Sequence, residues 1–344
     1  MKKQLPFPIW LPVLLAIIVV VFCVLFFLLF NYVIMADSTP NSAANTADAS
    51  TPSPTCVDLY QYYGWTDTVN ITVYNHSTEQ IVSMGLEEYI LGVVAAEMPA
   101  SYSLEALKAQ AVASRTYALY NMEHGGSSAH PDAAVCTASN CCQAYADEAR
   151  LMERWGADYA TNYNRIAQAV MSTAGQTILY EGELIDAMYH ACSGGATEDS
   201  ENVYSNAIPY LRGVSSPFEE PMREQNVSYS YQDLVALLQK EYPDCGITVE
   251  NARYELYIDE LYPSGRVAYI NIGFNITTGK KFRSAANLDS AMFTLAWTDE
   301  GVTFLVKGFG HGVGLSQNGA NGMGIHGSTY LEILNHYYTG VTIG

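Results

Sequence analysis

The sequence predicts an α+β protein: a single large domain of helices and mostly antiparallel strands, preceded by one apolar N-terminal helix. Polar and apolar residues alternate over 69–84, which is typical of a strand hairpin. Helical spacing begins at residue 86, and short strand-like segments recur after residue 177 without regular strand–helix alternation. The 344 residues are enough to bury a sizeable core.

The N-terminal segment is read as a membrane anchor. Residues 9–35 are almost continuously apolar and long enough to cross a bilayer. Lys2 and Lys3 leave residues 1–8 in the cytoplasm and export the rest, by the positive-inside rule. A cleaved signal peptide is the alternative, but its apolar core would span only about 7–15 residues. Residues 36–55 read as a flexible linker to an extracytoplasmic domain at 56–344.

The remaining elements follow from start and stop signals. A helix from Leu86 stops at Met98-Pro99, because the residue before proline avoids the helical region. Ser103 is a good N-cap for a second helix that ends near Gly125-Gly126. Beyond an irregular loop we expect a helix over 146–173, short strands within 177–195 and at 211–214, a helix near 231–241, strands at 252–258, 266–275 and 302–306, and a final helix within 328–338.

Composition limits the class of partner. Asp and Glu total 35 against 16 Lys and Arg, a net charge of −19. Nucleic-acid binders need clustered basic charge, so a nucleic-acid partner is excluded. The 26 tyrosines suit hydroxyl-rich ligands that are bound by stacking and hydrogen bonds, although tyrosine is also an ordinary core and strand residue.

Glu97 is the candidate catalytic acid. It ends the apolar run LGVVAAEMP, at the C-terminus of the first helix. The negative end of the helix dipole and the apolar neighbours both disfavour an ionised carboxylate, which raises the pKa toward the range of a general acid. Local sequence leaves an exposed helix-end glutamate as the alternative.

Three separated segments resemble the stage II sporulation protein D family, which is similar to amidase-enhancer domains. They are LEEYILGVVAAEMPASYSLEALKAQAVASRTYAL at 86–119, YHACSGGATEDSENVY with PYLRGV at 189–214, and GFGHGVGLSQNGANGMGIHGSTYLEILNHYYTGV at 308–341. The resemblance implies a membrane-anchored lytic transglycosylase that cuts peptidoglycan during engulfment in sporulation, with Glu97 as its acid and no organic cofactor. The alternatives are a non-catalytic, glycan-binding activator of a cell-wall amidase and a zinc-dependent hydrolase.

The resemblance also implies partners and substrate-facing residues. The partners are glycan strands stripped of stem peptides, the amidase stage II sporulation protein P, and protein M of the same stage. Glycines around His311 allow positive φ and close approach to a ligand, although a core histidine in a tight turn is the alternative. Arg115 would position a substrate carboxylate or pair with Glu97. The expected substrate-binding residues are Arg115, Tyr189, Ser193, Gly194, Gly195, His311, Ser316 and Gln317.

The loop HPDAAVCTASNCCQAY carries a candidate zinc site. Thiolates and imidazoles are the ligands that zinc prefers, and a loop without its own core gains order from a metal. A subset of the family resembles this loop through H-x5-C-x5-C, matched by His130, Cys136 and Cys142. Cys141 stands where that subset can have a histidine, so the fourth ligand is Cys141, His124 or water. Disulfides are the alternative. The zinc is expected to be structural or to shape the site.

Overall fold

The structure is a computed structural model that describes residues 68–344 apart from residue 128. Within these residues helices mix with small, mostly antiparallel sheets, which confirms the α+β class. The predicted segments 1–8, 9–35 and 36–55, and the start of 56–344, lie outside the described residues. In the described part of the chain, no helix combines the length and the apolar character needed to span a bilayer.

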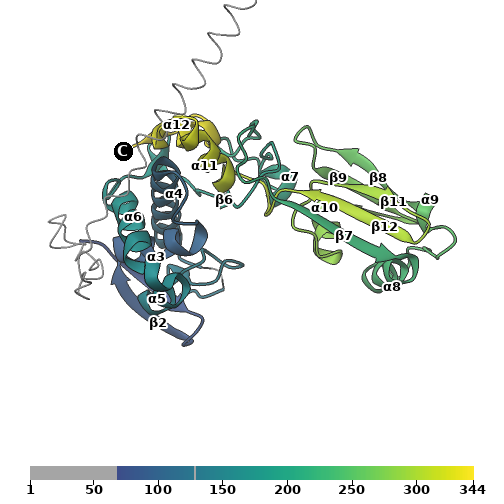
Figure 1. Cartoon of the computed structure of the whole chain (residues 1–344), viewed down its shortest axis with the longest axis horizontal. Coiled ribbons are helices and arrows are strands. Elements are labelled where there is room, and N and C mark those ends of the chain that lie inside the picture. The colour runs from purple at the N-terminus through teal and green to yellow at the C-terminus, as the bar shows by residue number, and fades with distance from the viewer. Residues whose placement is uncertain (1–67, 128) are drawn as a thin grey trace, which may run out of the picture. The chain divides into compact units, whose positions relative to one another are not determined.

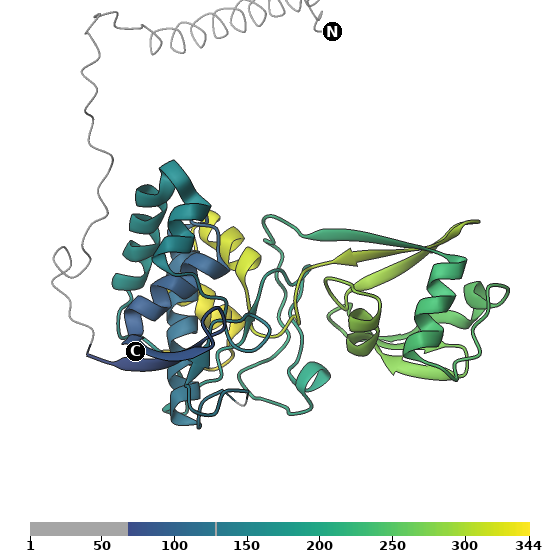
Figure 2. The ribbon, with the colours of Figure 1, turned by 90° about the horizontal axis from the view of Figure 1, so that it is seen from below.

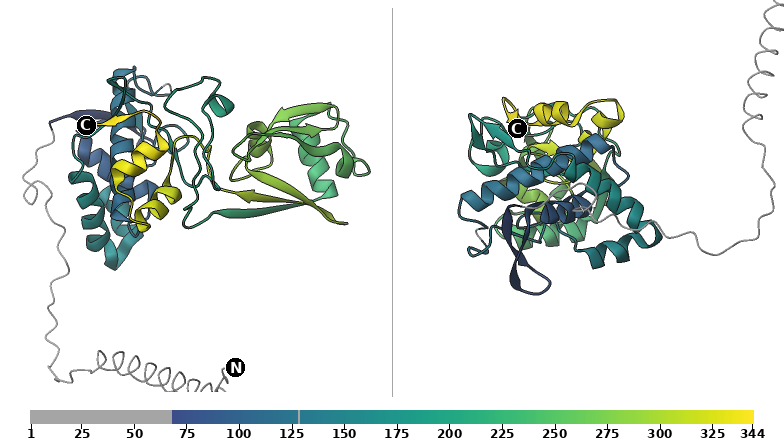
Figure 3. Two further views of the ribbon diagram at one scale, coloured as in Figure 1. Left: turned by 90° about the horizontal axis from the view of Figure 1, so that it is seen from above. Right: turned by 90° about the vertical axis from the view of Figure 1, so that its left-hand side faces the viewer.

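The first hydrophobic core is built around one long helix, α4 (Figures 1 and 3). Helices α3, α6, α11 and α12 all pack against α4. The predicted packing face of the first helix is confirmed, since Tyr89, Val93 and Val94 are fully buried. The helices that surround this core are α3 (Leu86–Glu97), α4 (Leu104–Glu123), α5 (Glu148–Trp155), α6 (Tyr159–Met171), α11 (Gln317–Ile325) and α12 (Tyr330–Tyr337).

Short strands border this core. The predicted hairpin is confirmed as β1 (Asn70–Asn75) paired antiparallel with β2 (Gln80–Gly85). Strand β3 (Val135–Cys136) lies parallel to β1 on its other side. The remaining strands are the sheet of β14 (Thr342–Ile343), β4 (Ile178–Tyr180) and β5 (Glu183–Leu184), and the parallel pair β6 (Tyr189–His190) and β13 (Leu315–Ser316).

A second hydrophobic core lies within residues 224–307, between the second and third sequence segments. Figure 2 shows its long strands β7 and β12 running side by side. Phe282, Phe293 and Phe304 are buried at its centre. It consists of β7 (Glu224–Ser230), α8 (Tyr231–Glu241), α9 (Ala252–Glu255), β8 (Leu256–Leu261), β9 (Val267–Ile272), β10 (Asn275–Thr278), α10 (Gly279–Ala285), β11 (Phe293–Trp297) and β12 (Gly301–Lys307), in antiparallel sheets ordered β10-β9-β8 and β11-β12-β7.

Several predicted elements are wrong in detail. The helix expected over 146–173 is broken at Gly156, which has a φ of 50° and caps α5. The strand expected at 252–258 begins as the short helix α9, and 266–275 is two strands separated by a turn at Gly273 (φ 59°). Residues 211–214 form no strand, and the short helix α7 (Glu201–Tyr204) precedes them.

Helix α11 was not expected, because its sequence QNGANGMGI reads as a glycine-rich loop. The glycines serve packing. A Cβ on Gly322 would lie 1.6 Å from the Phe218 carbonyl oxygen, and one on Gly324 would lie 2.1 Å from Ser103 Oγ. Glycine is therefore required for α11 to approach these neighbours, and tertiary contact outweighs the low helix propensity of glycine.

Candidate active site

The parallel pair β6–β13 brings the second and third sequence segments together. Tyr189 lies opposite Leu315, and His190 lies opposite Ser316. Gln317, the first residue of α11, follows directly and reaches the end of α3, where its Nε2 donates to Glu97 Oε2 at 3.1 Å. Three segments that are far apart in the sequence therefore meet at Glu97.

Glu97 is the last residue of α3, and its carboxylate is held from two sides. The backbone N–H of Ala144 donates to Oε1 at 2.7 Å, while Gln317 bonds Oε2. Burial raises the pKa of Glu97 above its ordinary value of 4.5, in the predicted direction, and hydrogen bonds from Ala144, Gln317 and Tyr189 partly offset this. The carboxyl group therefore keeps its proton to higher pH than an exposed glutamate.

Glu97 opens onto a cavity of about 560 Å³. This volume is within the range of ligand pockets, about 300–1,000 Å³. Part of the wall is fixed by Tyr102, whose hydroxyl donates to Asn318 Oδ1 at 2.6 Å. The lining residues are Glu97, Pro99, Tyr102, Ala191, Cys192, Pro221, Met222, Arg223, Glu224, Phe309, Gln317 and Asn318.

Tyr189 stands beside Glu97 and is held by a residue that sequence analysis missed. Its hydroxyl donates to Gln143 Oε1 at 2.8 Å. Burial and the nearby Glu97 carboxylate raise the pKa of Tyr189 well above its ordinary value, so the phenol stays protonated. Gln143 directly follows the cysteine pair and precedes Ala144, and nothing in the local pattern marked it as a site residue.

Arg115 does not face the cavity, so both expectations for it are wrong. Its side chain is fully buried. Nε donates to Glu87 Oε1 at 2.6 Å and Nη2 to Glu87 Oε2 at 2.5 Å, a two-pronged ion pair inside the first core. Arg115 is therefore committed to Glu87 and neither pairs with Glu97 nor reaches a substrate in this structure.

Ser193 and Ser316 are buried and bound to a third residue, which corrects their predicted contact with substrate. Both hydroxyls donate to Glu219 Oε1, from Ser316 at 2.8 Å, and Ser216 does the same at 2.8 Å. Glu219 thereby ties together the loops that carry these serines. Its role depends on contacts 26 and 97 residues apart in the chain, which no local motif indicates.

Gly194 and Gly195 complete the turn beside Ser193, with φ values of 80° and 120°. The Gly195 carbonyl accepts a hydrogen bond from the Ser216 N–H at 2.8 Å. Neither glycine is among the residues that line the cavity at Glu97. Their positive φ values support a role in shaping the loop.

His311 lies half-buried in a turn, as in the alternative weighed above, and both of its ring nitrogens are used by backbone groups and not left for the predicted contact with sugar. Nε2 lies 2.9 Å from the Tyr189 carbonyl oxygen, and Nδ1 accepts from the Val313 N–H at 3.1 Å. Burial lowers the pKa of His311 to about 4, so the ring is neutral with both nitrogens bonded to backbone. It lines a separate cavity of about 60 Å³.

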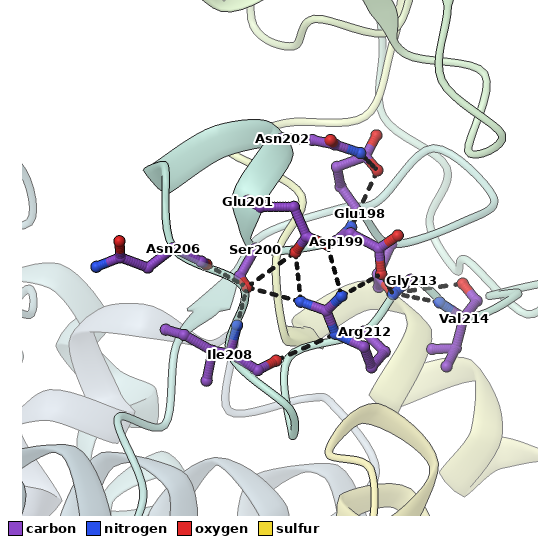
Figure 4. Close-up of polar contacts among 11 residues, drawn as sticks. Glu198, Asp199, Ser200, Glu201, Asn202, Asn206, Ile208, Arg212, Gly213 and Val214 are labelled. Atoms are coloured by element: carbon purple, nitrogen blue, oxygen red, sulfur yellow. Dashed lines mark hydrogen bonds and ion pairs between the residues drawn. The ribbon is translucent and has the colours of Figure 1, made fainter.

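A polar network fixes the loop over residues 198–214, within the second segment (Figure 4). Arg212 Nη1 donates to Glu201 Oε1 at 2.8 Å, and Nη2 donates to Ser200 Oγ at 2.8 Å. Nε donates to the Ile208 carbonyl at 3.1 Å. The guanidinium holds the pKa of Glu201 at about 2, below its ordinary value. Arg212, from the PYLRGV segment, thus links both arms of the loop.

The cysteine loop has donors that fit a zinc ion. The sulfurs of Cys136, Cys141 and Cys142 all lie within 4.8 Å of one another, and so do the ligand atoms of His76, His130 and Cys136. Soft thiolates with imidazole form an ordinary zinc donor set. Sequence analysis missed His76, which belongs to the turn of the β1–β2 hairpin.

Within residues 68–127 and 129–344, this loop contains neither a disulfide nor a donor group that includes His124. The sulfurs of Cys141 and Cys142 are 3.7 Å apart, well beyond a disulfide bond length of about 2.05 Å. Cys136, Cys141 and Cys142 are free thiols in the structure. His124 belongs to neither donor group, and its Nδ1 lies 2.8 Å from the Tyr120 carbonyl oxygen.

Comparison with known proteins decides the family. A family model described as "Stage II sporulation protein" matches residues 74–180, which include Glu97 and the cysteine loop. Stage II sporulation protein D of Bacillus subtilis is 34% identical over 275 residues, covering 80% of this chain and 79% of the relative. The chain belongs to the stage II sporulation protein D family. The Bacillus amyloliquefaciens member of this sporulation family is also 34% identical, and the amidase enhancer of Bacillus subtilis is 28% identical over 73% of this chain and 40% of its own length.

Proposed function

We propose that this member of the stage II sporulation protein D family is a lytic transglycosylase that cleaves peptidoglycan glycan strands stripped of stem peptides, with Glu97 as acid and then base. One observation carries the proposal. A carboxyl group of raised pKa opens onto a cavity large enough for a ligand, with one oxygen held by Ala144 and the other by Gln317. This is the arrangement a general acid requires.

The chemistry needs one proton donor. Protonated Glu97 gives its proton to the glycosidic oxygen as the bond to C1 of the muramic residue breaks. The resulting carboxylate then removes the proton of the C6 hydroxyl, whose oxygen bonds to C1 and closes a 1,6-anhydro ring. The proton returns to Glu97, and no water is consumed. Ala144 and Gln317 stabilise the carboxylate in the intermediate state through their hydrogen bonds.

A hydrolase would need a second carboxylate to activate water or act as nucleophile. Glu224 also lines the cavity, but it is exposed at the start of β7 and lies across from Lys307 of β12 in the sheet register. Glu97 is the less exposed carboxyl of the two. A single-acid mechanism therefore accounts for the site, and Glu224→Gln is expected to keep both the cleavage and the anhydro product.

Zinc is proposed to shape the site from His130, Cys136, Cys142 and either Cys141 or His76. Bound there, it would cross-link the loop and leave the acid–base chemistry to Glu97. The position of the cysteines in the chain supports this proposal. Cys142 is followed by Gln143, which bonds Tyr189, and by Ala144, which bonds Glu97. A metal that orders the cysteines would therefore also fix the positions of Gln143 and Ala144 beside Tyr189 and Glu97.

The cellular setting is part of the proposal. Anchoring by residues 9–35 and a tether over 36–55 would hold the enzyme outside the cytoplasm at the membrane, in the space between the two membranes of a sporulating cell. The family and its likeness to an amidase enhancer support a role in cell-wall remodelling during engulfment. Stage II sporulation proteins P and M are the partners proposed for it, with protein P supplying stripped strands.

The test compares the full-length chain in detergent with Glu97→Gln on stripped glycan strands, and detects the ends by mass spectrometry. Anhydro-muramic ends are expected with the wild type and are lost with Glu97→Gln. The variant preserves size and can still accept a hydrogen bond from Ala144. Reducing ends without anhydro sugar would overturn the proposal in favour of hydrolysis.

The second candidate is a non-catalytic activator of a cell-wall amidase, favoured by the likeness to the amidase enhancer. On that reading the wild type binds strands without cutting them, and amidase stimulation is the same for the wild type and Glu97→Gln. A requirement for Glu97 in producing anhydro ends separates the two functions.

A further inference from the structure

We infer that Arg223 and Phe309 form a subsite that binds a muramic residue by its lactyl carboxylate, in the cavity that contains Glu97. The inference rests on the proposed function, because it assumes a muramic strand as the ligand. Both residues line that cavity, and sequence analysis singled out neither. The subsite would make the negative charge of a stripped strand a recognition signal.

The side chain of Arg223 is oriented by one ion pair, which leaves part of its hydrogen-bonding capacity unused. Its Nε lies 3.2 Å from Asp289 Oδ2, and 57% of its side chain is exposed. Within residues 68–127 and 129–344, no partner is hydrogen-bonded to its two terminal nitrogens. Asp289 thus fixes one edge of the guanidinium and leaves the other edge free. The two terminal nitrogens of that edge can bind a carboxylate through two parallel hydrogen bonds.

Phe309 supplies an apolar surface beside this charge. Phe309 is 43% exposed, and the guanidinium carbon of Arg223 lies 5.5 Å from the centroid of its ring. Its backbone is fixed by a pair of hydrogen bonds with Cys192, N–H to carbonyl, at 2.8 Å and 3.0 Å. An exposed aromatic ring held by a rigid backbone suits the C–H face of a pyranose, with the lactyl arm toward Arg223.

A continuous wall connects this subsite to the acid. Gln317 bonds Glu97, and the next residue, Asn318, donates from Nδ2 to the Pro221 carbonyl at 2.5 Å. Pro221 lies two residues before Arg223, and all of these residues line one cavity. A strand that reaches Glu97 therefore runs along the surface that presents Arg223.

Charge makes the position selective. The chain carries a net charge of −19, yet of the described residues that line this cavity Arg223 alone is cationic. Glu224 is its acidic neighbour and lies across from Lys307 in the sheet. A lactyl group with a stem peptide is an amide and has no charge, whereas a stripped one is a carboxylate. Arg223 therefore favours stripped strands over strands that carry peptides.

The test measures binding in the Glu97→Gln background, in which turnover is removed. Full-length protein in detergent is titrated calorimetrically with stripped muramic oligomers and with the same oligomers methyl-esterified at the lactyl carboxylate. The free acid is expected to bind about tenfold or more tightly than the ester, because a charged hydrogen-bonded pair is lost in the ester. Adding Arg223→Gln brings this ratio close to one.

Two further variants distinguish recognition from folding. Phe309→Ala weakens the free acid and the ester by the same factor, since both keep the sugar ring. Arg253→Ala, an exposed arginine of α9, is the charge-matched control and leaves the ratio unchanged. A preference for the free acid that persists in Arg223→Gln, or equal binding of acid and ester before that change, overturns the subsite. Wild-type protein that makes no anhydro ends while the Arg223-dependent ratio holds would overturn the enzyme proposal and leave the subsite standing.

Discussion

Replacing Arg115 by methionine should destabilise the fold, because Arg115 is a structural residue inside the first core. The change removes two hydrogen bonds to Glu87, at 2.6 Å and 2.5 Å, and one each to the carbonyls of Gln176 at 3.2 Å and Val170 at 3.3 Å. Glu87 is itself buried and would lose its countercharge. Breaking a buried pair from one side costs about 3–5 kcal/mol.

This cost translates into a measurable shift in melting. At about 2–4 °C for each kcal/mol, the wild type and Arg115→Met should differ by about 6–20 °C in Tm, and urea denaturation should give the matching loss of unfolding free energy. The double variant Arg115→Met, Glu87→Leu should recover most of the loss, because it removes both charges together. It should not recover all of it, since the N–H of Gly175, 3.2 Å from Glu87 Oε1, and the two carbonyls lose a partner.

Lys108 provides the matched control in the same helix. Its pair with Glu105 at 2.7 Å is partly exposed, so Lys108→Met should cost about 1 kcal/mol or less. An Arg115→Met protein that melts with the wild type but no longer cleaves strands would refute the structural role. It would return Arg115 to substrate binding, as the sequence first suggested.

Three further predictions follow from the site. Because the folded pKa of Glu97 is raised above 4.5, kcat/KM for strand cleavage should fall as pH rises through that raised value. The Tm of the wild type should fall relative to that of Glu97→Gln as pH rises from the ordinary pKa through the raised one, and below the ordinary pKa the difference between the two Tm values should not change with pH. Chelation or Cys142→Ser should reduce cleavage about 10–100-fold while circular dichroism shows the helical core retained, and full activity in chelator would contradict a site-shaping metal. Arg212→Ala should lower unfolding free energy by only about 1 kcal/mol, since the pair with Glu201 is partly exposed, and a larger loss in urea denaturation would contradict that reading.

Local sequence was sufficient where one segment determines the outcome. The end of the first helix at Glu97 follows from the proline at 99, and the capping role of Ser103 follows from its position before an alanine-rich run; both are confirmed. The raised pKa of Glu97 was predicted in direction from its apolar neighbours, and burial is its largest cause. In each case the interacting groups are close in the chain, so periodicity and capping rules apply directly.

Sequence was insufficient where a residue is defined by a distant partner. Arg115 pairs with a residue 28 positions away, and His311 bonds a carbonyl 122 positions away. Their residue types suit both substrate binding and internal bonding, so only the fold distinguishes these roles. The same holds for Gln143 and Arg223, which no residue pattern marks as site residues and which are recognised only as neighbours of Tyr189 and Phe309.

The residues of the glycine-rich and serine-containing motifs fall into two groups. Some hold the loops in place, and others face the cavity. Ser193, Ser316 and His311 use their polar groups on the protein itself, and this fixes two loops around Glu219 and the β6–β13 pair. The residues that these loops present to the cavity are Ala191 and Cys192 from the second segment and Phe309, Gln317 and Asn318 from the third. Gln317 follows Ser316 directly and bonds Glu97 Oε2, whereas Ala144 of the cysteine loop bonds Oε1. A shift of about 1 Å in the loop that carries Gln317 would release a hydrogen bond that orients the carboxylate, so this loop must be rigid. On the proposed function, residues such as Ser193, Ser316 and His311 would affect cleavage only through the position of the groups around Glu97.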